Sequence, residues 1–253
     1  MKIKDIVSAL ERFAPLPLQE SYDNAGLQVG VTEAEVSGAL LCLDVTEEVI
    51  GEAIDLGCNL IVAHHPLLFR PLRRLSDEDH VQRCLRLAVR NDICIYASHT
   101  NLDNAEDGVN YKMAEKLGLV DVVPMEGGGG VIGYLPIAED SLEFLERAKE
   151  VFRVECLQHN ELLQRPVQAV ALSGGAGSGS LEAALRLGAD AFVTGEMGYH
   201  LFFGLEQRIQ LAVLGHFQSE QYTTEIFYQI IGDVAPELPV FTTAVEVNPI
   251  KYL

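Results

Sequence analysis

The chain has 253 residues, 48% of them hydrophobic, and a formal net charge of −19. This length suits one large or two small α/β domains with a buried core. The negative charge disfavours nucleic acid as a partner, because phosphate neutralisation needs clustered Lys and Arg. No apolar segment approaches the roughly 18 residues that span a bilayer, and the first residues lack a signal-peptide apolar region. Five cysteines without CxxC spacing are typical of reduced core thiols, so we expect a cytoplasmic protein.

The first elements follow from apolar spacing. A helical pattern covers residues 3–13, and the turn-rich segment 21–27 contains Asp23 and Asn24, which are typical turn formers. A strand over 38–44, a helix over 46–56 with Thr46 as N-cap, and a strand over 60–63 follow. This βαβ order predicts a parallel sheet.

The strand at 60–63 leads into His64, His65 and Pro66. Because proline cannot donate to a sheet ladder, the strand should stop at the histidines. Both imidazoles would then lie at the carboxyl edge of the sheet, where open α/β sheets bind ligands. Adjacent residues of a strand point in opposite directions, so each ring could serve a different metal ion.

The remaining elements alternate in the same manner. We expect helices over 77–90 and 108–116 around a strand at 93–97, then a linker at Pro124 and glycines 127–130. A strand over 131–135, a helix over 141–152 and a short strand around 154–157 follow. The last elements are a strand from 167, a helix from 223 to 231 and a final strand over 240–247.

An internal repeat relates the two halves. Residues 52–63 parallel residues 183–194 at an offset of 131, and residues 93–99 parallel residues 210–216 at an offset of 117. We therefore expect an α/β fold of two similar lobes with mixed, largely parallel sheets, flanking helices and a metal cleft between the lobes. The first lobe would cover residues 1–125 and the second 126–253, with the C-terminal strand able to return to the first.

The repeat also aligns metal-competent side chains. His99 and Asp103 are four residues apart, as are His216 and Glu220, a spacing that places both groups on one helix face. The polar groups at predicted strand ends are His64, His65, His99, Asp103, Glu196, His216 and Glu220, with His200 close behind. A single histidine at a strand end is more often structural, but histidines and carboxylates without cysteine together favour a catalytic divalent site. Three histidines and two carboxylates, five ligands in all, are too many for one open ion and suit a pair.

One basic cluster, Arg70, Arg73 and Arg74, follows the histidine pair. It is either a solvated loop or a local positive patch that draws an anionic substrate toward the metal edge.

Five phrases resemble the dinuclear-metal family named GTP cyclohydrolase 1 type 2-like, also called Nif-three-like. They are residues 21–30, 63–67, 99–103, 194–196 and 215–220. The resemblance covers the whole chain and implies a toroidal homohexamer. It also favours a cleft-facing position for Asp23 and Asn24 over a role in the turn alone. It also implies two divalent ions per subunit (zinc, iron or manganese), with His64, His65, Asp103, His216 and Glu220 as ligands and Glu220 bridging.

The sequence thus leads to one main hypothesis and two alternatives. The main one is a hydrolase of a nucleotide-like or phosphate-bearing small molecule, with ring-opening of GTP as the case the resemblance implies. His99, Glu196 or His200 would shuttle the proton, and Arg70, Arg73 and Arg74 would hold phosphate. The alternatives are a metal-binding hexameric scaffold or regulatory interaction protein without turnover, and a plain structural protein. Fold alone does not fix the substrate.

Overall fold

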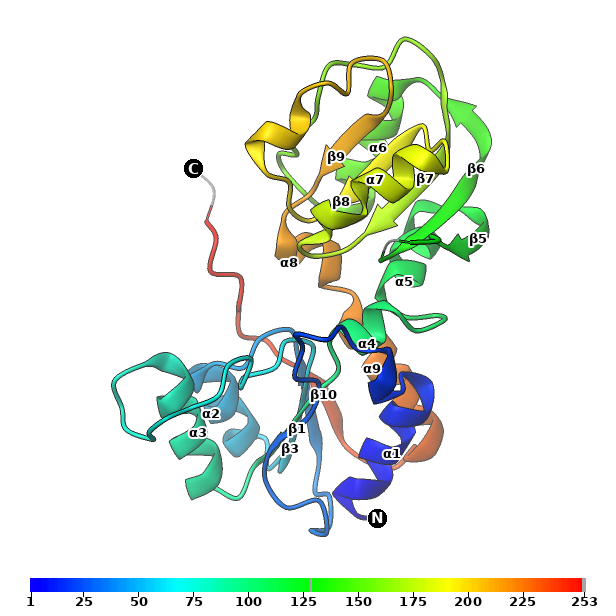
Figure 1. Ribbon diagram of the computed structural model, residues 1–253. Coiled ribbons are helices and arrows are strands. Elements are labelled where there is room, and N and C mark those ends of the chain that lie inside the picture. Colours follow the sequence, from blue (N-terminus) through cyan, green and yellow to red (C-terminus); the bar gives the residue numbers. More distant parts are fainter. Residues whose placement is uncertain (128, 252–253) are drawn as a thin grey trace. The chain divides into compact units, whose positions relative to one another are not determined.

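A computed structural model describes residues 1–127 and 129–251, and Figure 1 shows its helices and strands. The chain divides into two compact units. The first contains residues 1–105 and 223–253, and the second contains residues 106–222. Each unit is built on its own five-stranded sheet.

The first sheet has the order β1-β4-β3-β2-β10. Its parallel centre consists of β2 (Ala39–Cys42), β3 (Leu60–Ala63) and β4 (Cys94–Ala97), all completely buried. The strand β10 (Val240–Thr242) adds parallel to β2, and β1 (Gly26–Val29) adds antiparallel to β4. Burial on both faces explains why the central strands are continuous apolar runs.

Helices cover both faces of this sheet, as Figure 1 shows. On one face lie α2 (Glu47–Asp55) and α3 (His80–Arg90), which share a core with Leu40, Ile61 and Ile95. On the other lie α1 (Ile3–Phe13) and α9 (Thr223–Val234), which contact each other. The short elements η1 (Leu16–Leu18) and α4 (Thr100–Asp103) complete the unit.

The second sheet has the order β5-β6-β7-β8-β9. Its parallel strands are β7 (Val167–Ser173), β8 (Ala191–Thr194) and β9 (Gln210–Val213), and the antiparallel pair β5 (Val120–Pro124) and β6 (Val131–Glu139) extends it. The helices α5 (Val109–Leu117) and α6 (Ser141–Phe152) share a core with one face of this sheet. The helix α7 (Leu181–Arg186) packs with the other face. The short helices are η2 (Gly177–Ser180), η3 (Tyr199–Phe202) and α8 (His216–Glu220).

The expected α/β fold with two mixed sheets is confirmed, and the sequence repeat has a structural counterpart. The strands β2, β3 and β4 are parallel neighbours in the same order as β7, β8 and β9. Adding the repeat offset of 131 to the residue numbers that bound β3 gives the bounds of β8. None of the described helices is long and apolar enough to cross a membrane.

The compact units do not coincide with the expected ranges 1–125 and 126–253. Residues 106–125 belong to the second unit because β5 pairs with β6, and residues 223–253 belong to the first because β10 pairs with β2. The chain therefore enters the second unit once and returns. Part of the expected glycine linker, residue 128, lies outside the described residues.

Two predicted strands differ from the structure. Residues 154–157 are not a strand, because the Val154 amide bonds the Lys149 carbonyl and so completes the end of α6. The final strand ends at Thr242 rather than 247. The Ala244 amide donates to the Glu52 carboxylate at 2.9 Å, which draws the chain off the sheet ladder. The strands β1 and β5 were not expected from the sequence.

Candidate metal centre

Two adjacent histidines extend the ladder of β3 past its last residue. The amide of His64 donates to the Cys42 carbonyl at 3.2 Å, and that of His65 donates to the Leu43 carbonyl at 2.9 Å. Pro66 follows and ends the ladder. The histidine pair is therefore held at the carboxyl edge of the sheet by backbone hydrogen bonds, as the sequence predicted.

A third histidine joins them from the neighbouring strand. His99 lies just beyond β4 and just before α4, and its amide donates to Asn101 Oδ1 at 2.9 Å. Ring centroids are 5.0 Å apart for His64 and His65, 5.3 Å for His64 and His99, and 5.5 Å for His65 and His99. Each ring offers one nitrogen within 4.8 Å of the other two. The first unit thus assembles a three-histidine cluster by itself.

The Nδ1 atom of each ring in this cluster faces an oxygen that can only accept. The partners are the Ser98 carbonyl for His64, Asp44 Oδ1 for His65 and Asp23 Oδ1 for His99, each at 2.8 Å. Because a carbonyl or carboxylate cannot donate, Nδ1 must carry the proton. In the neutral ring Nε2 then holds the lone pair, which is the tautomer that a metal-binding histidine needs.

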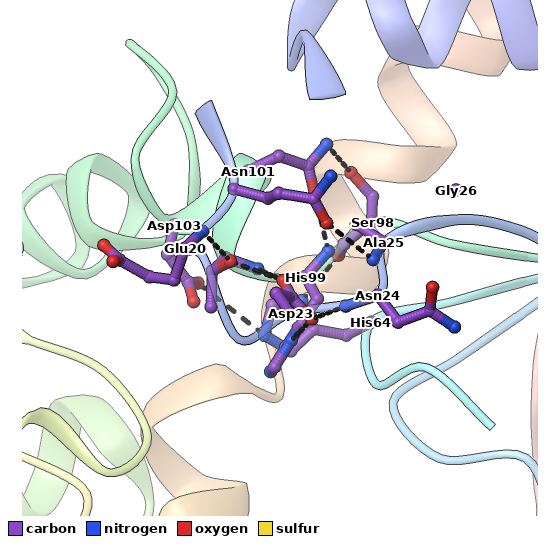
Figure 2. Close-up of polar contacts among 12 residues, drawn as sticks. Glu20, Asp23, Asn24, Ala25, Gly26, His64, Ser98, His99, Asn101 and Asp103 are labelled. Carbon is purple, nitrogen blue, oxygen red and sulfur yellow. Dashed lines mark hydrogen bonds and ion pairs between the residues drawn. The ribbon is translucent and has the colours of Figure 1, made fainter. Parts of the chain in front are cut away.

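Asp23 is tied to the cluster by more than one bond, as Figure 2 shows. It accepts from the Thr100 amide at 3.1 Å and the Asn24 amide at 2.7 Å, and also from the Thr100 hydroxyl. Burial opposes ionisation of this carboxyl, but the hydrogen bonds from His99 and Thr100 outweigh burial and hold the pKa of Asp23 at about 2. Asp23 is therefore a charged partner of His99 and not merely a turn former.

Asp103 brings a carboxylate to the same edge. Its Oδ1 lies 3.6 Å from Nε2 of the fully buried His64. It is the last residue of α4, so the short helix that His99 precedes carries this carboxylate. Nitrogen and carboxylate oxygen donors without thiolate fit zinc, iron or manganese.

The second unit presents a smaller set at the equivalent edge of its own sheet. His216 opens α8 just after β9, and its Nδ1 lies 2.8 Å from Glu196 Oε1, just after β8. Its Nε2 lies 3.2 Å from Oε2 of the buried Glu220, four residues along the helix. The tautomer argument applies again: the carboxylate of Glu196 fixes the proton on Nδ1 of His216.

Two glycines after β7, Gly174 and Gly175, leave room for the side chain of Glu220. A Cβ on Gly175, which follows β7 with a φ of +55°, would lie 2.2 Å from Glu220 Oε1 and 3.3 Å from His216 Nε2. The Gly174-Gly175 turn is therefore part of the wall around this pair.

The other predicted residues have different surroundings. Glu196 is placed as the acceptor for His216, and its expected proton-shuttle role stays a prediction. His200 is in η3, and its ring lies beside those of Tyr199 and of Phe203, the residue that follows η3. The exposed arginines Arg70, Arg73 and Arg74 make no ion pair within the described part of the chain.

Two groups that hold the histidines were not predicted from the sequence. Asp44 ends the predicted strand over 38–44, a position that could have paired it with His65 at the end of the next parallel strand. The Ser98 carbonyl accepts the hydrogen bond from His64 Nδ1. Because it is a backbone group, no residue type in the sequence points to it.

Fold and side chains together define an α/β protein whose two units each gather histidine and carboxylate groups at the carboxyl edge of a parallel sheet. The sequence profile of the Duf34/NIF3 family (NGG1p interacting factor 3) matches residues 1–249, and the chain belongs to this family. A "GTP cyclohydrolase 1 type 2 homolog" of Clostridium perfringens is 34% identical over 228 residues, 87% of each chain. One of Clostridium acetobutylicum is 29% identical over 265 residues, covering 100% of this chain and 99% of the relative.

Solved structures agree on the fold. A Bacillus cereus protein related to NIF3 superimposes with a TM-score of 0.90 at 23% identity, covering 100% of this chain and 99% of the other. Reduced HcgD from Methanocaldococcus jannaschii superimposes with a TM-score of 0.81 at 26% identity, covering 97% of this chain and 98% of the other.

Proposed function

We propose that this protein is a metal-dependent hydrolase of a nucleotide-like or phosphate-bearing small molecule, with ring-opening of GTP as the first candidate reaction. The proposed ligands of two divalent ions are His64, His65, Asp103, His216 and Glu220. Zinc, iron and manganese are the candidate metals. Family membership and the names of the relatives support the proposal.

The observation that carries the proposal is the shared arrangement of the histidines. In four rings, those of His64, His65, His99 and His216, Nδ1 faces an acceptor at 2.8 Å. A purely structural histidine needs no such uniformity, whereas metal-binding histidines almost always donate their second N–H to a carboxylate or carbonyl. His99 shares the arrangement, so it is a candidate ligand in addition to a proton shuttle.

Bound divalent ions would polarise the attacked bond and lower the pKa of water. Ring orientation, proton transfer and phosphate binding would fall to side chains of the protein. Asp44, Asp23 and Glu196 would orient the rings of His65, His99 and His216 through their hydrogen bonds to Nδ1. Proton transfer would fall to His99, Glu196 or His200, and the exposed guanidinium groups of Arg70, Arg73 and Arg74 would bind the phosphate of the substrate.

We further propose a cytoplasmic, toroidal homohexamer, on the family resemblance. Five free cysteines, four of them buried, support a reducing compartment.

The test is turnover by protein loaded with zinc, iron or manganese and supplied with GTP or a phosphoester. We expect hydrolysis that is lost in Glu220→Gln. The control variant is Glu150→Gln, which removes an exposed carboxylate on α6 and should keep the activity. Metal content, measured after purification without chelator, should fall in the first variant only. A fully metallated protein that consumes none of these substrates would contradict the hydrolase.

Analytical ultracentrifugation of the same protein, with and without metal, addresses the alternative of a metal-binding scaffold without turnover. In that case metal removal would change the sedimentation coefficient, while no substrate would be consumed by any metal form. Protein that binds no divalent metal would contradict both.

A further inference from the structure

A pocket of about 720 Å³ lies in the second unit. Two segments line it, residues 158–161 and residues 197–206. Its size falls within the 300–1,000 Å³ typical of small-molecule sites. None of its lining residues is a proposed metal ligand, although two of them, Tyr199 and Phe203, contact the ring of His200.

One wall of the pocket is fixed by the sheet beside it. Gln158 exchanges backbone hydrogen bonds with Val213 at 3.0 and 2.9 Å. The side chain of Asn160 accepts from the Leu211 amide at 2.8 Å and donates to the Ile209 carbonyl at 2.8 Å. These bonds attach the segment to β9, which is the edge strand, so the wall is formed before any ligand arrives.

The second segment supplies an aromatic wall. Tyr199, Phe202 and Phe203 line it, and the first and last of these are 73% and 62% exposed. The Tyr199 and Phe203 rings meet at 75° with centroids 5.4 Å apart. Two rings at this angle form a corner, and the face of an aromatic ring carries partial negative charge.

The charged groups of the pocket are acidic. Glu161 comes from one wall and Glu206 from the other, and neither makes an ion pair or side-chain hydrogen bond within the part of the chain described. No Lys or Arg is among the described lining residues. His159 also lines the pocket, and its Nδ1 donates to the Asn160 carbonyl at 2.7 Å, which leaves Nε2 as an acceptor in the neutral ring.

We propose that this pocket binds an organic cation, a protonated amine or quaternary ammonium group, between the aromatic corner and the two carboxylates. Aromatic faces attract such cations even where the rings are exposed to water, as Tyr199 and Phe203 are. A phosphate-bearing ligand would find repulsion instead of a basic partner. A bare divalent ion would gain nothing from three aromatic side chains. The inference does not depend on the proposed hydrolase activity.

The test compares choline with its neutral isostere 3,3-dimethyl-1-butanol, by calorimetric titration and saturation-transfer NMR of the full chain. Spermidine and benzyltrimethylammonium serve as further cationic probes. We expect saturable binding of at least one cation and about tenfold weaker binding of the neutral isostere of choline, which loses both the cation–π contact and the attraction to the two carboxylates. The double variant Glu161→Gln with Glu206→Gln removes the ionic attraction, and the variant Phe203→Leu removes one aromatic ring. Each should weaken binding about two- to fivefold.

Glu150→Gln, which removes an exposed carboxylate away from the pocket, should leave binding unchanged. Circular dichroism checks that each variant is folded. Equal affinity for choline and the neutral isostere, no saturable binding of any probe, or undiminished binding in the double variant would overturn the proposal. So would a change in oligomeric state of Phe203→Leu together with absent cation binding, which would make the aromatic wall a contact between copies of the chain.

Discussion

Asp44 Oδ1 accepts a hydrogen bond from Nδ1 of His65 at 2.8 Å, across two neighbouring parallel strands of the first unit. The carboxylate orients the ring and fixes its tautomer. We predict that Asp44→Asn, which keeps the shape but loses the charge, weakens divalent-metal affinity about tenfold or more. Titration against a competing chelator measures this. Asp55→Asn, an exposed carboxylate on α2, is the control, and equal affinities of the two variants would contradict an orienting role.

The turn after β7 gives a second prediction. Gly175→Ala would place a methyl group 2.2 Å from Glu220 Oε1, so we expect Glu220 to be displaced and the metal content per chain to fall. Gly188→Ala is a matched control, because its φ of +73° is also left-handed but nothing lies within 4 Å of the added carbon. Both variants should lose about 1 kcal/mol of unfolding free energy from the backbone conformation. Metal analysis should separate them. If both retain the same metal content, Gly175 has no role in positioning Glu220.

Asn101 gives a third prediction, about stability. This buried side chain donates to the Ala14 carbonyl at 2.7 Å and to Ser98 Oγ at 3.2 Å, and accepts from the His99 amide (Figure 2). Asn101→Ala leaves these groups without that partner, so we expect a loss of about 1–3 kcal/mol in unfolding free energy.

Asn104→Ala removes an exposed amide in the same region and should change stability by no more than about 0.5 kcal/mol. Urea denaturation of both variants measures the difference. Similar midpoints would show that the buried network is not stabilising.

The cysteines give a fourth prediction, on reactivity. Burial raises the pKa of the Cys84 thiol to about 12 and that of Cys94 to about 11, and it also raises the pKa of Cys42 and Cys58. Only Cys156 is exposed among the five. Because the thiolate is the reactive form, native protein at pH 8 should take up one iodoacetamide label per chain and denatured protein all five. Mass spectrometry counts the labels, and Cys156→Ser should take up none while folded.

The parallel strands and the helices were predictable because their signals are local. β3 and β8 are short apolar runs between a glycine and a polar strand end, and the helices show regular apolar spacing. β1 and β5 lack such signals. Gln28 interrupts the four residues of β1, and β5 contains Asp121 and ends in Pro124. Their strand conformation comes from pairing with neighbours that the local sequence does not reveal.

The candidate site divides in the same way. His64, His65 and Asp103 were found from strand ends and spacing, which are properties of a few neighbouring residues. Asp23 bonds His99 from 76 positions away, and only the folded backbone brings them together. Asp44 lies between these two cases. The sequence does not pair it with His65 directly, but the parallel register of β2 and β3 places the two residues side by side.

The return of the chain to its first unit has a consequence for synthesis. Residues 106–222 are contiguous and have all their sheet partners once residue 222 has emerged, whereas β2 lacks its outer neighbour until residues 240–242 have emerged. An unpaired strand edge is a template for association with other chains. During translation the unit that starts first is therefore the one that finishes last, and until then the β2 edge is open to pairing with other chains.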